Sequence, residues 1–473
     1  MQLPESFITE IKNLLGATEY EKFNNSYNNP PLRALRINKL KTSVFYNDLQ
    51  GVGLPKVQDI QWCKEGYTYS EDMRPSKSIF YKAGLFYIQE PSAMCPVEVL
   101  QPKKGDMVLD ICAAPGGKSA QIAGFLQGEG LLVSNDASPS RSKALVKNLE
   151  MAGVTNAVVL TEQPKKIAAR FPEFFDKILV DAPCSGEGMF RRDTNAVKAY
   201  TANKPETCAK MQKEILYYAA GLLKQGGQMV YSTFTFNTRE NEEVIADFLK
   251  QNPNFKLIPI DYKKLGISQG YDKQGRTARI WPHISKGEGH FIAHLQKDGE
   301  TAPQKVLLNK TAGDRFCHQH PDEKLRSNFS AYKTILPPRE FSDFCKTSLN
   351  INWTKNPTLH GTSIFLQSQP LNLTKLRTAR NGWYVGEKIS EKNKQFTPSQ
   401  ALAMGLIPTQ ATNYVNLSEA DAWRYLKGET LENTTEANEK LWILICHQNL
   451  PLGWAKLVQG RLKNQLPKGW VTT

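Results

Sequence analysis

The sequence predicts an α/β protein whose central unit is a doubly wound parallel sheet. The first observation is that five short apolar segments alternate with segments of helical period over residues 76–298. Apolar runs separated by helices are typical of parallel strands that are covered on both faces. The second observation is a glycine-rich turn directly after the first of these segments. The third is the length of 473 residues, which predicts further domains around this unit.

The expected elements follow one another along the chain. Residues 1–16 have the pattern of an amphipathic helix, and the Asn- and Pro-rich segment 24–38 leads into short strands. In the central unit we expect strands at 107–112, 131–136, 157–161, 177–182 and 228–233, and helices at 121–127, 142–152 and 211–223. Residues 289–296 are predicted to add a late strand at the edge of the sheet. Three aromatic-rich segments near the end, at 413–417, 441–447 and 452–458, predict a β-rich module.

These patterns divide the chain into four parts. We expect an N-terminal α+β domain (1–75) before the strand–helix unit (76–298). A polar, irregular segment (299–395) is interpreted as a small mixed domain, and the aromatic-rich end (396–473) as the β-rich module.

The charge of the chain points to a polyanionic partner. Sixty Lys and Arg against 46 Asp and Glu give a net charge of +14 and a sequence pI of about 9.2. This excess favours a nucleic-acid partner over a merely basic soluble enzyme. The hydrophobic fraction of 40% excludes a fully disordered chain. No run reaches the roughly 18 apolar residues of a spanning helix, which excludes a membrane protein.

The eight cysteines are scattered and form no CxxC pair, which argues against a disulfide scaffold. Residues 317–320 (CHQH) offer ligands that are too close in sequence for one tetrahedral site, so we expect no metal. The first residues have neither a basic start nor a long apolar run, so no signal peptide is expected. Together these features predict reduced thiols and a cytoplasmic protein.

The segment 108–123 (VLDICAAPGGKSAQIA) reads as a strand, a tight turn and the start of a helix. Gly116 and Gly117 allow a ligand to approach the backbone, and the helix start offers free N–H groups. The segment fits neither GxxxxGK[ST] nor GxGxxG. Asp136 ends the next strand roughly 20 residues on, where a carboxylate accepts from ribose hydroxyls. The pattern favours S-adenosylmethionine (SAM) over NAD; the alternative for Asp136 is an N-cap of the following helix.

The fourth predicted strand ends in the sequence DAPC at residues 181–184. Ligands bind at the carboxyl ends of such strands. Cys184 is a candidate thiolate of low pKa because cationic residues lie nearby in the sequence or at the predicted site, namely Lys118, Arg191 and Arg192. A thiolate can add to C6 of a pyrimidine, and Asp181 could then bond the N3 and N4 edge of a cytosine and protonate N3. The alternative is a buried, inert Cys at a turn.

Through these motifs, the sequence resembles the Nop/Sun family of RNA cytosine-5 methyltransferases. Within it, the chain is similar to the bacterial F-type enzymes that modify 16S ribosomal RNA. The motifs that carry the likeness are RALRIN (33–38), YIQEPSAM (87–94), DICAAPGGK (110–118), SNDASPSRSKALVKNLE (134–150), DAPCSGEGMFRRD (181–193), YST-T-NTRENEE (231–243) and KGEGHFIA (286–293). The tail at 450–470 is similar to the PUA-like RNA-binding end of these proteins. The likeness covers most of the chain and is thinnest over 299–395.

The resemblance implies a SAM-dependent enzyme with a Rossmann-like catalytic domain at 76–298, an RNA-binding N-terminal domain and a PUA-like end. By the family pattern the cofactor is held by Cys112, Ala113, Ala114, Pro115, Gly116, Gly117, Lys118, Asp136 and Asp181. The adenine contact after the third strand falls on Gln163, with Glu162 as the alternative. Lys118 and Asp181 are also expected at the catalytic centre, together with Cys184, which the family uses to release the product.

One residue departs from the family pattern. The family nucleophile is the Cys of a YSTCT motif, and this chain has Phe234 in its place. Three interpretations stay open: an impaired homologue that still binds SAM and RNA, Cys184 as the nucleophile, or a natural chain that carries Cys at 234. DNA cytosine-5 methyltransferases are similar in placing their nucleophile in a Pro-Cys motif. The residues around Phe234 keep the family pattern, which favours a recent change or retained binding.

Two basic clusters are predicted to contact RNA, mainly through phosphate. The early cluster contains Arg33, Arg36, Lys39 and Lys41; the late one contains Lys456, Arg461, Lys463 and Lys468, near Trp454 and Trp470. The alternative for either cluster is a solvated charged face. Binding through such clusters depends steeply on salt.

The leading hypothesis is SAM-dependent methylation of cytosine C5 in 16S rRNA. A non-catalytic rRNA-binding assembly factor and a tRNA cytosine-5 methyltransferase are the alternatives. The expected partner is 16S rRNA or the 30S subunit, and the family suggests a monomer.

Overall fold

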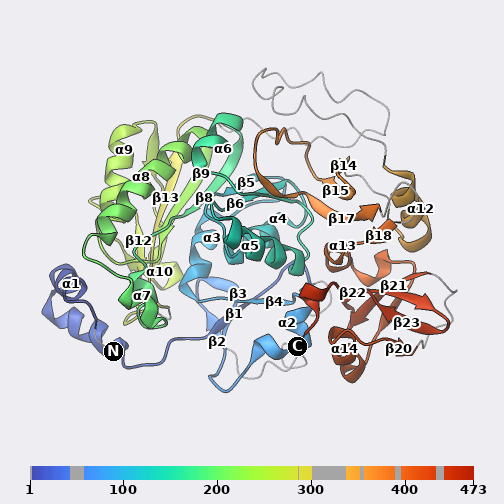
Figure 1. The fold of residues 1–473 in the computed structure, drawn as a ribbon. Coiled ribbons are helices and arrows are strands. Elements are labelled where there is room, and N and C mark those ends of the chain that lie inside the picture. Colours follow the sequence, from blue (N-terminus) through green and yellow to red (C-terminus); the bar gives the residue numbers. More distant parts are fainter. Residues whose placement is uncertain are drawn as a thin grey trace.

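The computed structural model describes residues 3–42, 58–285, 287–300, 337–351, 356–388, 396–432 and 441–472. The described strands form four sheets, one large and three small (Figure 1). None of the helices in these ranges is both long and apolar enough to cross a membrane. The segment 317–320 lies outside the described residues, so the absence of a metal there stays a prediction.

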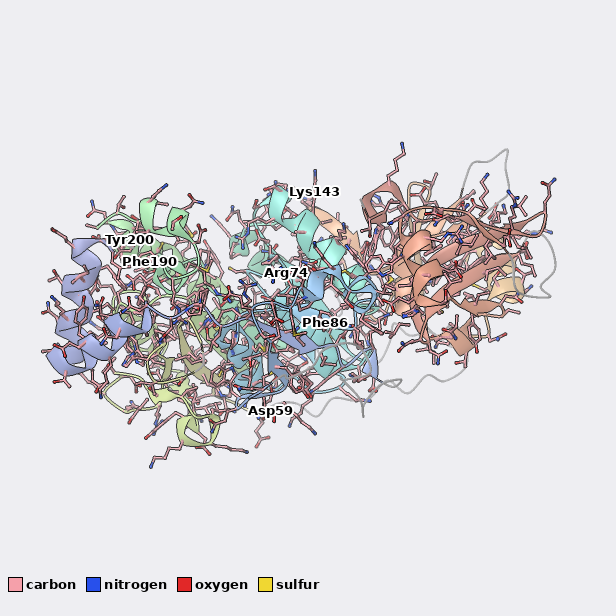
Figure 2. All side chains as sticks on the ribbon, turned by 90° about the horizontal axis from the view of Figure 1, so that it is seen from below. Asp59, Arg74, Phe86, Lys143, Phe190 and Tyr200 are labelled. Atoms are coloured by element: carbon pink, nitrogen blue, oxygen red, sulfur yellow. The ribbon has the colours of Figure 1, made fainter. Side chains whose placement is uncertain are left out.

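The N-terminal part combines a long helix with a four-stranded antiparallel sheet. The helix, α1 (Glu5–Ser26), begins where the sequence predicts and bends at Gly16, whose φ is 74°. Its buried Phe7 lies 5.0 Å from the ring of Phe190, beside which Figure 2 also shows Tyr200. The sheet order is β2-β3-β1-β4, from β1 (Ala34–Ile37), β2 (Gln58–Ile60), β3 (Cys63–Thr68) and β4 (Phe86–Ile88). Four short helices complete this part: η2 (Pro75–Lys77), α2 (Ile79–Lys82), η3 (Ser92–Met94) and α3 (Cys95–Leu100).

The central sheet has ten strands and contains the five parallel strands that the sequence predicts. In sheet order these are β7 (Ala157–Leu160), β6 (Leu131–Asn135), β5 (Met107–Asp110), β8 (Phe175–Asp181) and β9 (Leu223–Thr233). The chain runs outward from β5 in one direction and then returns to β8 on its other side. The strand order therefore reverses between β5 and β8, and this reversal is where such sheets bind ligands.

Helices cover both faces of this sheet (Figure 1). They are α4 (Gly117–Leu126), α5 (Pro139–Met151), α6 (Pro164–Arg170), α7 (Thr194–Lys198), α8 (Lys204–Leu222), α9 (Glu242–Gln251) and α10 (Tyr262–Leu265), with the short η4 (Glu187–Met189). Leu109 and Ile178 belong to one apolar core, and the adjacent Val108 and Leu179 belong to the other. Because both faces are buried, apolar residues follow one another directly in the middle of these strands instead of alternating with polar ones.

The expectation of an edge strand at 289–296 is wrong in its placement. The strand exists as β13 (His290–Lys297), but it pairs with β9 on one side and with β12 (Ala278–Ile280) and β10 (Phe255–Leu257) on the other. Beyond β12 lies β11 (Ser268–Gln269). Every residue of β13 from position 290 to 295 is buried, as is typical of an interior strand.

The C-terminal part contributes two small sheets. The first has the order β14-β15-β17-β18, from β14 (Asn356–His360), β15 (Ser363–Gln367), β17 (Trp383–Lys388) and β18 (Phe396–Pro398). The second has the order β19-β21-β22-β23-β20, from β19 (Tyr414–Asn416), β20 (Leu431–Glu432), β21 (Trp442–His447), β22 (Leu450–Val458) and β23 (Arg461–Asn464). The helices are α12 (Arg339–Ser348), α13 (Gln400–Gly405), η5 (Pro408–Gln410), α14 (Glu419–Leu426) and η6 (Lys468–Trp470). All three predicted aromatic-rich strands are confirmed.

The C-terminal part is joined to the central unit by hydrogen bonds. Strand β16 (Thr378–Asn381) pairs antiparallel with β7 and extends the central sheet. The Lys147 ammonium of α5 donates to the Gly469 carbonyl at 2.8 Å. Lys41, from the N-terminal part, donates to the Met404 carbonyl of α13. These contacts hold the C-terminal sheets beside the helix that follows β6.

Candidate active site

The glycine loop, defined here as residues 112–118, connects β5 to α4 at the reversal of strand order. The Ala113 N–H donates to the Asn135 carbonyl at 2.7 Å, which ties the loop to β6. Gly116 has a φ of 111°, in the region that favours glycine. A Cβ on Gly117 would lie 2.9 Å from the Tyr87 ring. Gly116 is therefore required by its backbone conformation and Gly117 by the close approach of the Tyr87 ring, and both leave the free N–H groups of the first turn of α4 beside the loop.

Asp136 lies where the sequence places it, after β6 and against the glycine loop. It is buried, and its carboxylate accepts from the Ala114 N–H at 3.3 Å and from the Ser138 N–H at 3.0 Å. The Arg141 guanidinium lies 3.4 Å from the same carboxylate. The N-cap of α5 is Ser138, so Asp136 does not fill the capping role that was its alternative.

The two candidates for the adenine contact occupy different environments. Glu162 is fully buried, and its carboxylate accepts from the Arg377 N–H at 2.8 Å, beside β16. The side chain of Gln163, the next residue, is exposed at the start of α6. Glu162 is therefore engaged in holding the C-terminal segment, which leaves Gln163 available to a ligand.

Asp181 is the polar centre of the site. Its Oδ2 accepts from Lys118 Nζ at 2.8 Å, and its Oδ1 accepts from Ser232 Oγ at 2.8 Å. His290 Nε2 lies 3.7 Å from the same Oδ1. Burial alone would raise the pKa of Asp181, but the cationic neighbours outweigh it and hold this pKa below its usual range. The side chain is thus an anion that presents hydrogen-bond acceptors.

The prediction of a low-pKa thiolate at Cys184 is wrong. Burial, and then the Glu240 carboxylate, raise the pKa of Cys184 far above its usual value. The cations expected to stabilise a thiolate are engaged elsewhere: Arg191 and Arg192 pair with Glu288, and Lys118 pairs with Asp181. The Cys184 sulfur instead accepts from the Phe234 N–H at 3.3 Å. Cys184 is therefore a protonated thiol directly beside the position of the family nucleophile.

The Phe234 ring takes the place of that nucleophile. Its centroid lies 4.9 Å from that of His290, at an interplanar angle of 37°. A Cβ on Gly188 would come within 2.8 Å of the ring, and the Gly188 N–H donates to the Phe234 carbonyl at 3.0 Å. The ring is thus packed against a glycine that has no room for a side chain.

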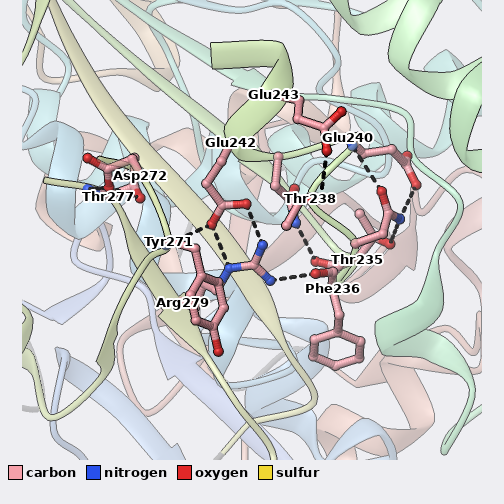
Figure 3. Close-up of polar contacts among 12 residues, drawn as sticks. Thr235, Phe236, Thr238, Glu240, Glu242, Glu243, Tyr271, Asp272, Thr277 and Arg279 are labelled. Carbon is pink, nitrogen blue, oxygen red and sulfur yellow. Dashed lines mark hydrogen bonds and ion pairs between the residues drawn. The ribbon is translucent and has the colours of Figure 1, made fainter. Parts of the chain in front are cut away.

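The loop that carries Phe234, residues 233–241, is held by buried polar contacts (Figure 3). Asn237 donates to the Glu240 carboxylate at 2.7 Å and to the Glu187 carboxylate at 3.0 Å. The buried Arg279 pairs with Glu242 and donates to the Phe236 carbonyl. Because these partners belong to the family motif NTRENEE or face it, the scaffold of the nucleophile is intact although the nucleophile is absent.

Four residues of the site had no predicted role. Asp110, under the glycine loop, accepts from Ser119 Oγ at 2.6 Å, and burial raises its pKa to about 7. Ser92 and His290 lie 3.0 Å apart, and Ser92 donates to Glu90. The sequence signal was present, since all four lie inside motifs of the resemblance, but a motif alone does not show which side chains meet.

Only part of the early basic cluster is exposed, so only part of it can contact RNA. Arg36 is buried and donates to the Gly117 carbonyl at 2.8 Å, so its predicted RNA contact is wrong; it supports the glycine loop instead. Lys41 is likewise buried against α13. Arg33 and Lys39 keep partial exposure, paired with Glu71 and Glu65. Alternation along β1 explains the error, because every second side chain faces the catalytic unit.

The late cluster lies on the last sheet. Arg461 and Lys463 on β23 are exposed, and Lys468 is exposed on η6. Lys456 is half-buried with its ammonium 5.6 Å from the Trp442 ring. Trp454 is a buried core residue rather than a surface aromatic, whereas Trp470 lies 5.7 Å from the ammonium of Lys147 on α5.

Comparisons with known proteins give a consistent result along the chain. Residues 97–296 match the model of the 16S rRNA methyltransferase RsmB/F, and residues 3–91 match that of the N-terminal domain of RsmF. The first C-terminal domain of RsmF matches residues 343–406, and its PUA domain matches residues 412–472. Among solved structures, a methyltransferase homologue from Pyrococcus horikoshii is 28% identical with a TM-score of 0.52, over 62% of this chain and 100% of that one. NSun6 from the same organism, at 23% identity and a TM-score of 0.54 over 63% and 99%, supports the fold alone.

Curated relatives extend the likeness over the full length. Ribosomal RNA small subunit methyltransferase F of Erwinia tasmaniensis is 32% identical over 98% of this chain and 96% of its own. The protein of that name from Shewanella oneidensis is 29% identical over 100% and 98%. The chain therefore belongs to the RsmB/F family of 16S rRNA methyltransferases, SAM-dependent enzymes with a Rossmann-like catalytic domain.

Proposed function

We propose that this chain methylates C5 of a cytosine in 16S rRNA, with the methyl group supplied by SAM. The observation that carries the proposal is the cluster around Asp181. There, acceptor oxygens at the end of β8 lie between Lys118 of the glycine loop and the Cys184–Phe234 contact. A site that combines acceptors for the edge of a pyrimidine, a cofactor loop and a thiol fits base methylation better than any other group transfer.

The residues present fit SAM. Asp136 offers a buried carboxylate for the ribose hydroxyls, Gln163 an exposed amide for the adenine, and Asp110 a buried oxygen, Oδ1, without a hydrogen-bond partner among the described residues. The glycine loop, with Cys112, Ala113, Ala114, Pro115, Gly116, Gly117 and Lys118, would hold the methionine end, together with Asp181. Bound SAM supplies an electrophilic methyl group, and the side chains around it orient the base and exclude water.

We propose Cys184 as the nucleophile of the chain as written. Its sulfur would form a bond to C6 of the cytosine while the ring electrons move toward N3, which takes a proton at the Asp181 side. The raised pKa of Cys184 leaves few thiolates at neutral pH. Loss of the ordinary nucleophile costs on the order of 6–8 kcal/mol in barrier, so slow turnover is expected.

A second candidate function is favoured by Phe234. A ring packed between Gly188 and His290 crowds the place of a flipped base while the cofactor side stays intact. Such a chain would bind rRNA and SAM as an assembly factor without turning over. Methylation of a tRNA is a further alternative, which the match to a PUA domain at 412–472 disfavours.

The test is a methylation assay with labelled SAM on 16S rRNA and on 30S subunits, read as 5-methylcytosine by nucleoside mass spectrometry. The chain as written, Phe234→Cys, Cys184→Ala and Cys208→Ala are compared, with Cys208 on α8 as the matched thiol control. We expect slow activity that Cys184→Ala abolishes, and a rise of several orders of magnitude in Phe234→Cys. Activity in Phe234→Cys alone supports the assembly factor, and no activity in any variant contradicts the proposed function.

RNA binding is proposed for the exposed cations. Two groups of cations would contact phosphates: Arg461, Lys463 and Lys456 on the last sheet, and Arg33 and Lys39 in the N-terminal part. The log–log salt plot of affinity is expected to be steep. A flat plot contradicts this role. We further propose a cytoplasmic monomer whose substrate is the 30S subunit or its rRNA. The four domains at 1–75, 76–298, 299–395 and 396–473 also remain proposals, with β16 of the third completing the sheet of the second.

A further inference from the structure

Behind Asp181 lies a chain of buried polar groups that the methylation chemistry described above does not use. It runs from Glu90 through Ser92 to His290 and ends at Asp181. Glu90 and Ser92 follow β4, His290 begins β13 and Asp181 ends β8, so three separate segments converge on one point. Ser92 is fully buried and His290 is 3% exposed.

The hydrogen bonds fix the orientation of the imidazole. The Ser92 hydroxyl has a single proton, and both the Glu90 carboxylate and the Gly289 carbonyl, at 3.2 Å, are acceptors for it. Its oxygen must therefore accept from His290 Nδ1–H, at 3.0 Å. This leaves Nε2 aimed at Asp181 Oδ1, 3.7 Å away, with no hydrogen-bond partner among the described residues.

A buried Nε2 that faces a carboxylate is satisfied only when it holds a proton. Without one, two lone pairs face each other; with one, an N–H lies between the ring and Oδ1. We propose that His290 is a positioning residue that holds a proton against Asp181 and supplies it, through that carboxylate, to N3 of the target cytosine. This inference rests on the proposed cytosine-5 methylation.

The attacking cysteine reacts as its thiolate: the sulfur–C6 bond forms, the C5–C6 electron pair moves into the ring toward N3, and N3 gains one proton. That proton leaves His290 Nε2 and passes through the Asp181 carboxylate, which is an anion before and after the step. His290 becomes neutral, with its Nδ1–H still on Ser92. Asp181 alone is a poor acid here, because Lys118 and His290 hold its pKa below the usual range. An imidazole is the side chain suited to deliver a proton near neutral pH.

Charged and polar groups from several elements surround His290. Asp181 faces it from β8, with Lys118 of α4 on the far oxygen, and Ser92 with Glu90 from the segment after β4. The Phe234 ring covers it from the loop after β9. Glu288, two residues earlier in the chain, is paired with Arg191 and Arg192. The charge nearest to Nε2 is thus the Asp181 carboxylate.

The first test does not need activity. The chain has seven histidines, so ¹⁵N-histidine NMR with His290→Gln identifies the signal of His290. We expect the Nδ1–H tautomer in the neutral form, and a shift of the Nε2 signal in Asp181→Asn because Nε2 faces that carboxylate. The opposite tautomer, or an Nε2 signal that Asp181→Asn leaves unchanged, overturns the proposal.

The second test is the pH profile of methyl transfer, in the chain as written or in Phe234→Cys, whichever is active. His290→Gln keeps a donor toward Asp181 but cannot titrate; we expect a loss of about 100-fold in kcat, a KM within about twofold, and loss of the inflection near neutral pH. His294→Gln is the matched control, a buried histidine four residues farther along the same strand, beside Lys177 instead of Asp181. An unchanged kcat or a retained inflection in His290→Gln overturns the proposal. If no background methylates RNA, the proposed function fails and the NMR result alone decides on His290.

Discussion

The two halves of the site differ in a way that separates binding from chemistry. On the cofactor side, the glycine loop and Asp136 have the residues and contacts that the family pattern demands. On the base side, the backbone and its polar scaffold are equally intact, yet the ring of Phe234 stands where a sulfur is needed. One side chain can therefore remove a reaction step while the loop and the polar contacts that positioned the nucleophile remain.

The base-side scaffold can be broken through the buried pair of Arg279 and Glu242. Arg279→Met leaves Glu242 as an uncompensated buried carboxylate and frees the Phe236 carbonyl, so we expect a loss of about 3–5 kcal/mol in unfolding free energy. Chemical denaturation measures it. Arg276→Met, three residues away with one carbonyl contact, is the matched control and should cost under about 1 kcal/mol. Equal losses in the two variants would show that the pair does not anchor the loop.

The cofactor side has a pH signature at Asp110. Its folded pKa of about 7 lies above the ordinary value of 3.8, so the folded state binds the extra proton between these values and stability falls as pH rises through that range. We expect the wild type to lose about 2–3 kcal/mol more than Asp110→Asn between pH 5 and pH 8. Denaturation curves at both pH values measure the difference, and the exposed Glu129→Gln serves as control. Parallel pH dependence in wild type and Asp110→Asn would refute this assignment.

Asp136→Asn tests whether the cofactor side binds as its geometry suggests. Loss of a charge-assisted hydrogen bond costs about 1.5–3 kcal/mol, which predicts SAM binding about 10- to 100-fold weaker by calorimetry. Asp106→Asn, at the opposite end of β5, should leave the affinity unchanged. An unaltered affinity in Asp136→Asn would move the ribose site elsewhere.

The contact between Gly188 and Phe234 tests whether the ring occupies the space of the nucleophile. Gly188→Ala places a Cβ within 2.8 Å of the ring, so we expect a loss of about 1–3 kcal/mol in stability. In Phe234→Cys the ring is gone, and the same substitution should cost much less. A double-mutant cycle measures this coupling. Additive losses would mean that the ring does not occupy this space.

Local patterns in the sequence predict much of this molecule. The five parallel strands follow from apolar runs between helices, and the need for Gly116 follows from a tight turn before a helix. What could not be predicted depends on distant partners. The sequence predicts an RNA contact for Arg36, but in the folded chain its guanidinium donates a hydrogen bond to the carbonyl of Gly117, 81 residues later.

Two further failures have the same physical origin. The pKa of Cys184 is set by burial and by Glu240, which no local pattern shows, so the sign of its shift was predicted wrongly. Strand β16 joins the central sheet through β7, which precedes it by more than 200 residues. Pairing at such separation depends on the folded surroundings rather than on the strand itself.

Phe234 alters the base side of the site and leaves the cofactor side unchanged. The most direct test is the SAM affinity of the chain as written and of Phe234→Cys, measured by calorimetry on matched preparations. We expect the two dissociation constants to agree within about threefold, because the ring contacts Gly188 and His290 and no contact with the glycine loop or Asp136 is seen among the described residues. If the chain with Phe234 fails to bind SAM but the Phe234→Cys variant binds it, then Phe234 also disturbs the cofactor side.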